Sequence, residues 1–191
     1  YRHTILMIVG HLRLDSRFDD FRDRIVRVPF APEEQWPRAL SMFDINIAPF
    51  ETRNPYCRAK SEIKYVEAAA LGIPTVASKI DSYEYAIENT ENGLLASTTD
   101  EWIKYLELLI EDEEKRRKVG QNARRDVAER YSPSKRSQDL VGIINNITSA
   151  TSGGLFNYRT AYQSMRKPIL EINWIVPALI KGGGGHMNIF R

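Results

Sequence analysis

The sequence predicts an α/β fold in which helices cover both faces of a parallel β-sheet. Short apolar segments such as 4–9 and 73–77 have little polar interruption, which is typical of strands buried on both faces. Segments of helical length separate these strands along the chain. Strands that alternate with helices indicate parallel pairing. The composition, 42% hydrophobic and 27% charged, is ordinary for a globular protein.

The first half of the chain opens with an apolar strand at 4–9, and a short strand follows at 24–28. Pro32 then begins a helix, because proline suits the first helical turn and the two glutamates after it suit the positive N-terminal end. The next strand is expected at 44–49. Residues 50–60 contain a proline and no periodic pattern, so we expect a loop there.

The second half begins with a helix from Ser61 to Leu71, which Ser61 can cap and which Gly72 ends. Apolar segments predict two more strands, separated by a short helix. Three helices complete the pattern, and the last of them is amphipathic. The expected ranges are 73–77 and 94–96 for the strands, and 83–88, 99–110, 113–131 and 133–148 for the helices.

Composition divides the chain into three parts. Residues 1–148 form one Rossmann-like module, and the small and polar residues that open 149–167 indicate a linker. Residues 168–191 combine a strand, four glycines and a helix start, which is the opening of a second Rossmann-like module. Because the chain opens inside a strand and closes in a first helical turn, we expect truncation at both ends. The N-terminal strand and helix of the first module would then be missing.

Charge and cysteine content exclude several classes of protein. Lys and Arg number 27 and Asp and Glu 25, so the net charge of +2 argues against a nucleic-acid partner. The single cysteine, Cys57, excludes an internal disulfide framework and a multi-cysteine zinc site, and it suits a reducing compartment. No apolar run approaches the roughly 20 residues that span a bilayer. We therefore expect a cytoplasmic location.

The segment 44–78 carries the candidate ligand site. A strand ends at Pro49, a loop follows, and a helix begins near Ser61. Ligands of open α/β sheets bind beyond the carboxyl ends of strands, and a helix N-terminus suits a phosphate. Ser61, Lys64 and Glu67 are spaced three apart, so they lie close to one helix face. This predicts a nucleoside diphosphate site, with Ser61 and Lys64 at the phosphates and Glu67 at the ribose hydroxyls.

Each of these residues also has a plainer interpretation. Ser61 can act as a helix cap alone, and Lys64 and Glu67 can be ordinary solvated side chains. Arg58 and Lys60 flank the predicted phosphate-binding turn, and either can equally be solvated. We assign the aromatic side chains elsewhere to the core: Trp36, Trp102 and Tyr105.

Three blocks of sequence resemble a known family. They are DINIAPFE at 44–51, KSEIKYVEAAALGIPTVAS at 60–78 and NGLLA at 92–96. Together they resemble the donor-binding C-terminal domain of GT-B glycosyltransferases, most closely the retaining enzymes of group 1, or family four. The resemblance covers about residues 1–148. It implies the C-terminal half of a GT-B fold and transfer of a hexosyl or deoxyhexosyl unit from a nucleotide sugar to a glycan or lipid-linked acceptor in polysaccharide biosynthesis.

The resemblance also implies roles for single residues. Glu67 would bind the ribose, Lys64 and the helix start at Ser61 would hold the diphosphate, and Pro29 and Phe30 would flank the base. No metal or other cofactor is implied. The acceptor domain of the same polypeptide would precede this chain, so the chain alone is expected to be inactive. The last helix would face that domain, which predicts partly exposed side chains at Leu140, Ile143, Ile144 and Ile147.

One departure from the family pattern concerns catalysis. Many relatives have a glutamate eight places before the ribose-binding one, and this chain has Ala59 there. Glu62 or Glu51 would have to substitute, or nothing does, so the catalytic residue stays open. A non-catalytic Rossmann module that binds a nucleotide or a partner protein is therefore the alternative function.

The end of the chain resembles the start of the N-terminal domain of another glycosyltransferase. Similar openings occur in bacterial enzymes of rhamnan and surface-polysaccharide assembly, and the residues concerned are 172–177, 181–186 and 189–191. The whole protein would then contain tandem transferase modules. Peripheral association of that full-length protein with the inner face of the membrane stays open.

Overall fold

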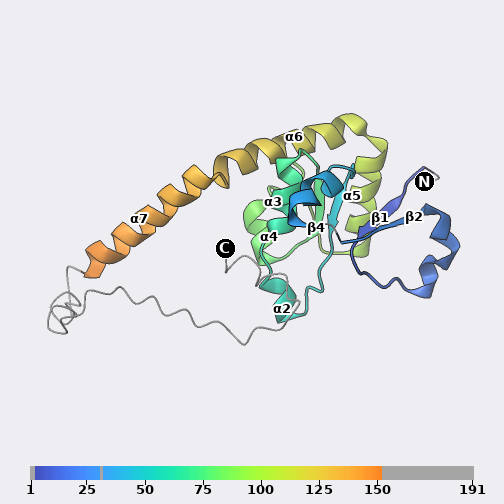
Figure 1. The fold of residues 1–191 in the computed structure, drawn as a ribbon, viewed down its shortest axis with the longest axis horizontal. Helices are drawn as coiled ribbons and strands as arrows, with labels where there is room; N and C mark the ends of the chain where they lie inside the picture. The colour runs from blue at the N-terminus through green and yellow to red at the C-terminus, as the bar shows by residue number, and fades with distance from the viewer. Residues whose placement is uncertain (1–2, 31, 152–191) are drawn as a thin grey trace. The chain divides into compact units, whose positions relative to one another are not determined.

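The computed structural model describes residues 3–30 and 32–151 (Figure 1). The chain divides into two units, Tyr1–Val141 and Gly142–Arg191. Most of the predicted linker at 149–167 and the whole of the second module predicted at 168–191 lie outside the described residues.

Strands and helices alternate, as the sequence predicts, and each strand predicted within residues 1–148 is present within two residues of its expected bounds. The chain also contains a 3-10 helix, η1, and a one-turn helix, α2, that the sequence analysis did not predict. In order, the elements are β1 (Leu6–Val9), η1 (Ser16–Arg24), β2 (Ile25–Val28), η2 (Glu33–Gln35), α1 (Trp36–Leu40), β3 (Asn46–Ala48), α2 (Pro55–Arg58), α3 (Ile63–Ala70), β4 (Thr75–Ser78), α4 (Asp81–Ala86), β5 (Leu94–Ala96), α5 (Thr99–Glu111), α6 (Glu113–Arg130) and α7 (Pro133–Thr151).

All strand pairs in the described residues are parallel, which confirms the predicted α/β class. Hydrogen bonds join the strands into two sheets, β1–β2 and β3–β4–β5. In the first, Met7 lies opposite Val26, and in the second, Val76 lies between Ile47 and Leu94.

Helices cover both faces of the β3–β4–β5 sheet. Successive side chains of a strand point to opposite faces, so Val76 and Ala77 of β4 enter different core clusters. Ala77 packs with side chains of α3 and α4, among them Tyr65 and Tyr83. Val76 packs with side chains of α5, among them Leu109. This two-sided burial explains why the strand segments are almost wholly apolar.

Helix α6 contributes to both clusters and lies close to the turn after α3. Val119 belongs to the α5 side, and Ala123 belongs to the α3 side. Gly72 has a φ of +76°, so it ends α3 in the left-handed conformation that the sequence predicts. A Cβ atom on Gly120 would lie only 2.0 Å from the carbonyl oxygen of Gly72. Two glycines therefore allow the backbones of α6 and this turn to touch.

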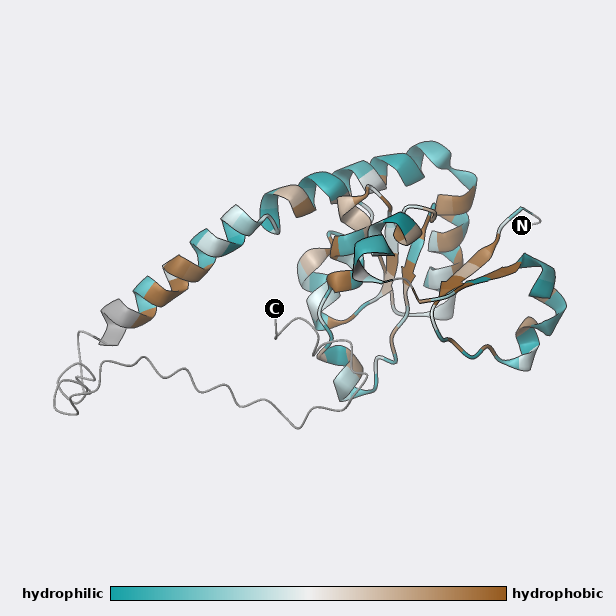
Figure 2. Cartoon of the chain, viewed as in Figure 1, coloured by the Kyte–Doolittle hydropathy of each residue, from teal (hydrophilic) through white to brown (hydrophobic). Residues whose placement is uncertain are grey.

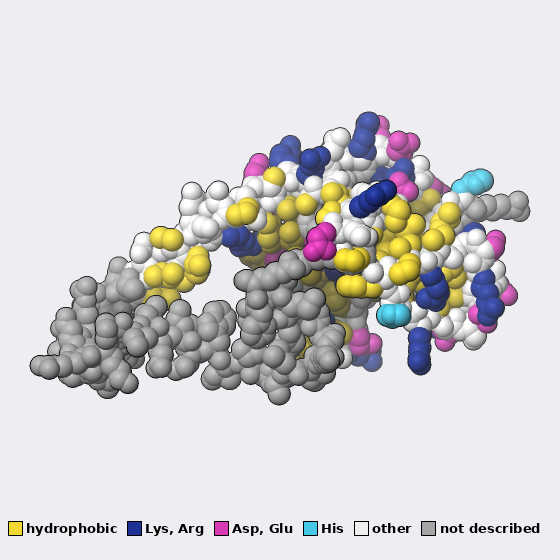
Figure 3. All heavy atoms as spheres, in the orientation of Figure 1, with side chains coloured by type: hydrophobic (Ala, Val, Ile, Leu, Met, Phe, Trp, Pro, Cys, Tyr) yellow, Lys and Arg dark blue, Asp and Glu magenta, His cyan; other side chains and the backbone are white. Residues whose placement is uncertain are grey.

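The apolar side chains of α7 are exposed, as predicted. The exposed fractions range from 49% for Ile144 to 60% for Ile147. Figure 2 shows brown, hydrophobic segments along α7, and Figure 3 shows hydrophobic side chains on α7 and over the β1–β2 sheet. No helix in the described part of the chain is long and apolar enough to cross a membrane.

Candidate functional site

The predicted site lies where β3 and β4 end and α3 begins. Ser78, at the end of β4, is hydrogen-bonded to Phe50, which follows β3. The Phe50 N–H donates to Ser78 Oγ at 2.8 Å, and Ser78 Oγ donates to the Phe50 carbonyl at 3.3 Å. On β3, the buried Asn46 donates its amide to the carbonyl of Lys64 at 3.1 Å. The first two bonds join the segment after β3 to the end of β4, and the third joins the first turn of α3 to β3.

The prediction that Ser61 caps α3 is wrong. The helix begins at Ile63, and the residue at the cap position is Glu62. The carbonyl of Glu62 accepts the N–H groups of Tyr65 and Val66 at 2.9 and 3.1 Å, so the helical hydrogen bonds start from residue 62. Ser61 is exposed and lies one residue before the cap, where its hydroxyl no longer serves as the N-cap acceptor.

Lys64 and Glu67 lie one turn apart on α3 and differ in their surroundings. Lys64 is exposed, and its Nζ lies 5.3 Å from the centre of the Phe50 ring. Glu67 is half-buried, and its Oε2 accepts the indole N–H of Trp36 at 3.0 Å. The two residues thus present an exposed cation and a hydrogen-bonded carboxylate on neighbouring turns of one helix.

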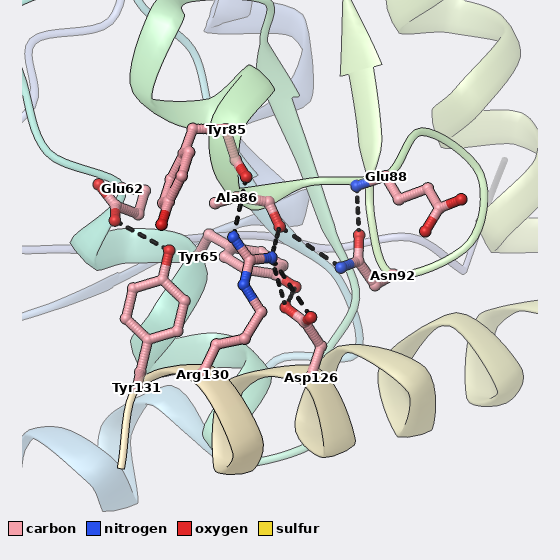
Figure 4. A network of polar contacts seen from close by, with 9 residues as sticks. All are labelled: Glu62, Tyr65, Tyr85, Ala86, Glu88, Asn92, Asp126, Arg130 and Tyr131. Atoms are coloured by element: carbon pink, nitrogen blue, oxygen red, sulfur yellow. Dashed lines mark hydrogen bonds and ion pairs between the residues drawn. The ribbon is translucent and has the colours of Figure 1, made fainter. Parts of the chain in front are cut away.

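Glu62, the candidate for a catalytic carboxylate, is held by a tyrosine. The hydroxyl of Tyr131 donates to Glu62 Oε1 at 2.9 Å (Figure 4). Burial raises the pKa of Tyr131, and the hydrogen bond to Glu62 raises it further. The other residue proposed to substitute, Glu51, is exposed in the loop after β3.

The end of α6 is anchored close to Tyr131 by an arginine. Arg130 donates to the carbonyls of Tyr85 at 3.0 Å and Ala86 at 3.3 Å, and it pairs with Asp126 at 3.2 Å (Figure 4). Tyr65 of α3 donates to the same aspartate at 3.4 Å. This network joins α3, α4 and α6 and so fixes the position of Tyr131 beside α3.

Arg58 and Lys60 are engaged in the loop between β3 and α3. Arg58 donates to both carboxylate oxygens of Asp81, at 2.9 and 3.1 Å. The ammonium of Lys60 lies 4.5 Å from the centre of the Tyr56 ring. The backbone carbonyl of Lys60 accepts a hydrogen bond from the Ser82 hydroxyl at 2.6 Å. These contacts attach the loop to the start of α4. Both cations remain exposed.

Pro29 and Phe30, the residues predicted to flank a base, follow β2. Pro29 lines a pocket of about 610 Å³ at the carboxyl ends of β1 and β2, together with His11 and Arg13 of the loop after β1 and Arg27 of β2. Phe30 is 75% exposed, and its ring lies 3.6 Å from the position of a Cβ on Gly10. The pocket is open and basic, and an exposed aromatic ring stands at the neighbouring position.

Three aromatic residues near the predicted site were missed by the sequence analysis. Trp36 packs against a core cluster, as predicted, and its indole N–H also donates to Glu67. Tyr131 contacts Glu62 across 69 positions of sequence, and no local spacing indicates such a contact. Tyr83 is fully buried against Phe50, and its hydroxyl has no hydrogen-bond partner among the described residues. Burial and the charges of Glu62 and Glu67 raise the pKa of Tyr83.

In the described ranges 3–30 and 32–151, no three or more His, Cys, Asp or Glu residues are grouped so that they could hold a metal ion. Cys57 is a free, half-buried thiol on α2.

The parallel strands, the helices on both faces of the β3–β4–β5 sheet and the polar start of α3 define a Rossmann-like α/β domain. Residues 3–142 match the family model described as glycosyl transferase-like, and the chain belongs to that family. No curated protein matches the chain in sequence.

Solved structures with a similar fold are GT-B glycosyltransferases. Anabaena HepE in complex with UDP-glucose is 18% identical with a TM-score of 0.58, and the match covers 74% of this chain and 41% of HepE. The C-terminal domain of LpcC, a group 1 glycosyl transferase family protein of Francisella tularensis, is 22% identical with a TM-score of 0.50, covering 62% of this chain and 59% of that domain.

A third similar structure is a variant of S. aureus TarM in complex with fondaparinux, α-GlcNAc-glycerol and UDP. It is 18% identical with a TM-score of 0.57, and the match covers 74% of this chain and 29% of TarM. At these identities the likeness shows the fold. The chain spans about two fifths of the length of HepE.

Proposed function

We propose that residues 1–148 are the donor-binding domain of a retaining glycosyltransferase that transfers a sugar from a nucleotide sugar to a glycan or lipid-linked acceptor in polysaccharide biosynthesis. One observation carries this proposal: Lys64 and Glu67 lie one turn apart at the start of α3, beside the carboxyl ends of β3 and β4. HepE was crystallised with UDP-glucose and the TarM variant with UDP, which supports a nucleotide sugar as the donor.

The proposed roles follow from charge and position. Lys64 and the N-terminal end of α3 bind the diphosphate, because an ammonium and free backbone N–H groups both favour an anion. Glu67 accepts hydrogen bonds from the ribose hydroxyls. Pro29 and Phe30 flank the base. Ser61, Arg58 and Lys60 line the approach to the phosphates, with Arg58 held by Asp81.

The wider context is also part of the proposal. An acceptor domain of the same polypeptide precedes residues 1–148, and a linker and a second module follow at 149–167 and 168–191. Transfer requires donor and acceptor to be held in reactive geometry between two domains, so the 191-residue chain alone has no transferase activity. The site needs no metal or other cofactor. The protein acts in the cytoplasm, at the inner membrane face if the acceptor is lipid-linked.

A second candidate function is a module that binds a nucleotide without catalysing transfer. Two observations favour it: Ala59 stands where relatives have a glutamate, and the nearby Glu62 is bound to Tyr131. Both functions require nucleotide binding. Measured transfer by the full-length protein separates them, because only the first yields product.

The experiment that tests nucleotide binding uses the 191-residue chain and UDP, GDP and ADP. We expect at least one of them to raise the melting temperature and to bind in calorimetry. Lys64→Ala should lower the affinity for the nucleoside diphosphate roughly tenfold to a hundredfold, because a charge-assisted contact is worth about 1.5–3 kcal/mol. The affinity for the nucleoside should stay unchanged. Glu67→Gln should lower the affinity for both the diphosphate and the nucleoside, because Glu67 is proposed to bind the ribose.

Lys104→Ala, which removes an exposed lysine of α5, is the matched control and should bind like the unsubstituted chain. Absence of binding to all three nucleotides would refute the proposed function. Unchanged affinities in both α3 variants would refute the assignment of the site.

A further inference from the structure

Trp36 connects the segment after β2 to the proposed ribose carboxylate. It is the first residue of α1, and its indole Nε1 donates to Glu67 Oε2 at 3.0 Å. An indole N–H can only donate, and this N–H has one hydrogen to give. A hydrogen bond to an ionised carboxylate is stronger than one between neutral groups. The contact therefore restrains the carboxylate of Glu67 before any ligand arrives.

The Trp36 ring is itself held in place. It packs against a core cluster formed by Leu40 of α1, Ala68 of α3 and Ile73. Ala68 directly follows Glu67, so the same packing that holds the ring also brings α1 against the helix that carries the carboxylate. Pro37 restricts the backbone at the start of α1. The donor and the acceptor of this bond are thus placed by packed elements.

The geometry of the bond leaves acceptor capacity for a ligand. The indole uses Oε2 of Glu67, and a carboxylate has about four lone-pair sites on its two oxygens. Glu67 is only half-buried, so its carboxylate can still be reached from the surface. A restrained acceptor binds a hydroxyl pair better than a freely rotating one, because less side-chain entropy is lost on binding.

We propose that Trp36 is a positioning residue that sets the preference of the site for ribonucleotides over 2′-deoxyribonucleotides by fixing Glu67. The proposal rests on the proposed function, because it takes Glu67 as the ribose acceptor. Trp36 does not contact the ligand in this account. Removal of the indole should therefore lower the affinity for ribonucleotides, which depends on the ribose hydroxyls, and leave the affinity for 2′-deoxynucleotides unchanged.

The test is Trp36→Phe in the 191-residue chain, with Trp102→Phe as the matched control. Trp102 is also half-buried and packs against a different core cluster. Affinities are measured by calorimetry for UDP, GDP and ADP and for their 2′-deoxy counterparts. We expect the unsubstituted chain and Trp102→Phe to prefer the ribonucleotide at least tenfold. In Trp36→Phe the preference should fall below threefold, with the affinity for the 2′-deoxynucleotide unchanged.

Trp36→Leu, whose side chain is apolar and cannot donate a hydrogen bond, is measured beside Trp36→Phe so that a folded variant without a side-chain donor is available. A tenfold preference retained in either folded variant would overturn the proposal, and so would equal weakening of both nucleotides. An unsubstituted chain that binds both nucleotide forms equally would also overturn it, although nucleotide binding would stand. Failure of the unsubstituted chain to bind any of the six nucleotides would instead refute the proposed function.

Discussion

The ring of Tyr83 is fully buried against Phe50, the residue whose own ring lies beneath the ammonium of Lys64. Its hydroxyl has no hydrogen-bond partner within the described part of the chain. A buried polar group without a partner costs about 1–3 kcal/mol of stability. The ring of Tyr65 is equally buried, but its hydroxyl donates to Asp126.

We therefore expect Tyr83→Phe to increase the free energy of unfolding by about 1 kcal/mol, because it removes an unsatisfied hydroxyl and keeps the ring. Tyr65→Phe is the matched control. It should decrease the free energy of unfolding by about 1 kcal/mol, because it removes a hydroxyl that has a hydrogen-bond partner. Urea denaturation of the two variants measures both values. Destabilisation of Tyr83→Phe to the same extent as Tyr65→Phe would show that the Tyr83 hydroxyl has a partner after all.

At the residue scale, the sequence predicts the contacts that depend on local spacing. Lys64 and Glu67 lie on neighbouring turns because three positions make almost one helical turn. The bonds from Trp36 to Glu67 and from Tyr131 to Glu62 cross 31 and 69 positions, so they depend on how helices pack. The cap at Ser61 was predicted wrongly because helix starts are uncertain by one or two residues.

At the scale of elements, the close approach of α6 to the end of α3 determines how the two helices pack. The turn after α3 has a Schellman pattern, in which Gly72 N–H donates to Ala69 and Ile73 N–H donates to Ala68. Gly120 of α6 lies against the carbonyl of Gly72. A side chain at position 120 would have to displace backbone atoms, because the nearest atoms belong to the main chain.

Gly120→Ala should destabilise the protein by about 3 kcal/mol or more, because its Cβ would lie 2.0 Å from the Gly72 carbonyl oxygen. Gly142→Ala in α7 is the control, because a Cβ there has no other atom within 4 Å. The control should be neutral or stabilising by up to about 1 kcal/mol, since alanine favours a helix more than glycine does. Thermal unfolding compares the two, and equal stabilities would contradict the close packing of α6 on this turn.

The strands were predicted within two residues because burial on both faces leaves a continuous apolar pattern. The two missed elements lack such a pattern. The 3-10 helix η1 is highly charged and has no buried residue, and α2 is a single turn. Asn54 and Pro55 are a cap and first-turn pair, and they are the one local signal that could have indicated α2.

At the scale of the whole molecule, every residue of the proposed donor site lies in the first unit, Tyr1–Val141, and the family match ends at residue 142. We therefore expect nucleotide binding to depend on this unit. The exposed apolar side chains of α7 begin at its end, at Leu140.

An amide chemical-shift titration of the 191-residue chain with UDP, GDP and ADP tests most directly whether α3 carries the donor site. With the nucleotide that binds, we expect the largest shifts at Phe50 and at residues 62–67. Residues 100–111 of α5 lie on the opposite face of the sheet and should stay unchanged. Shifts concentrated on α5, or the absence of shifts at 62–67 under saturating nucleotide, would contradict the claim that α3 carries the donor site.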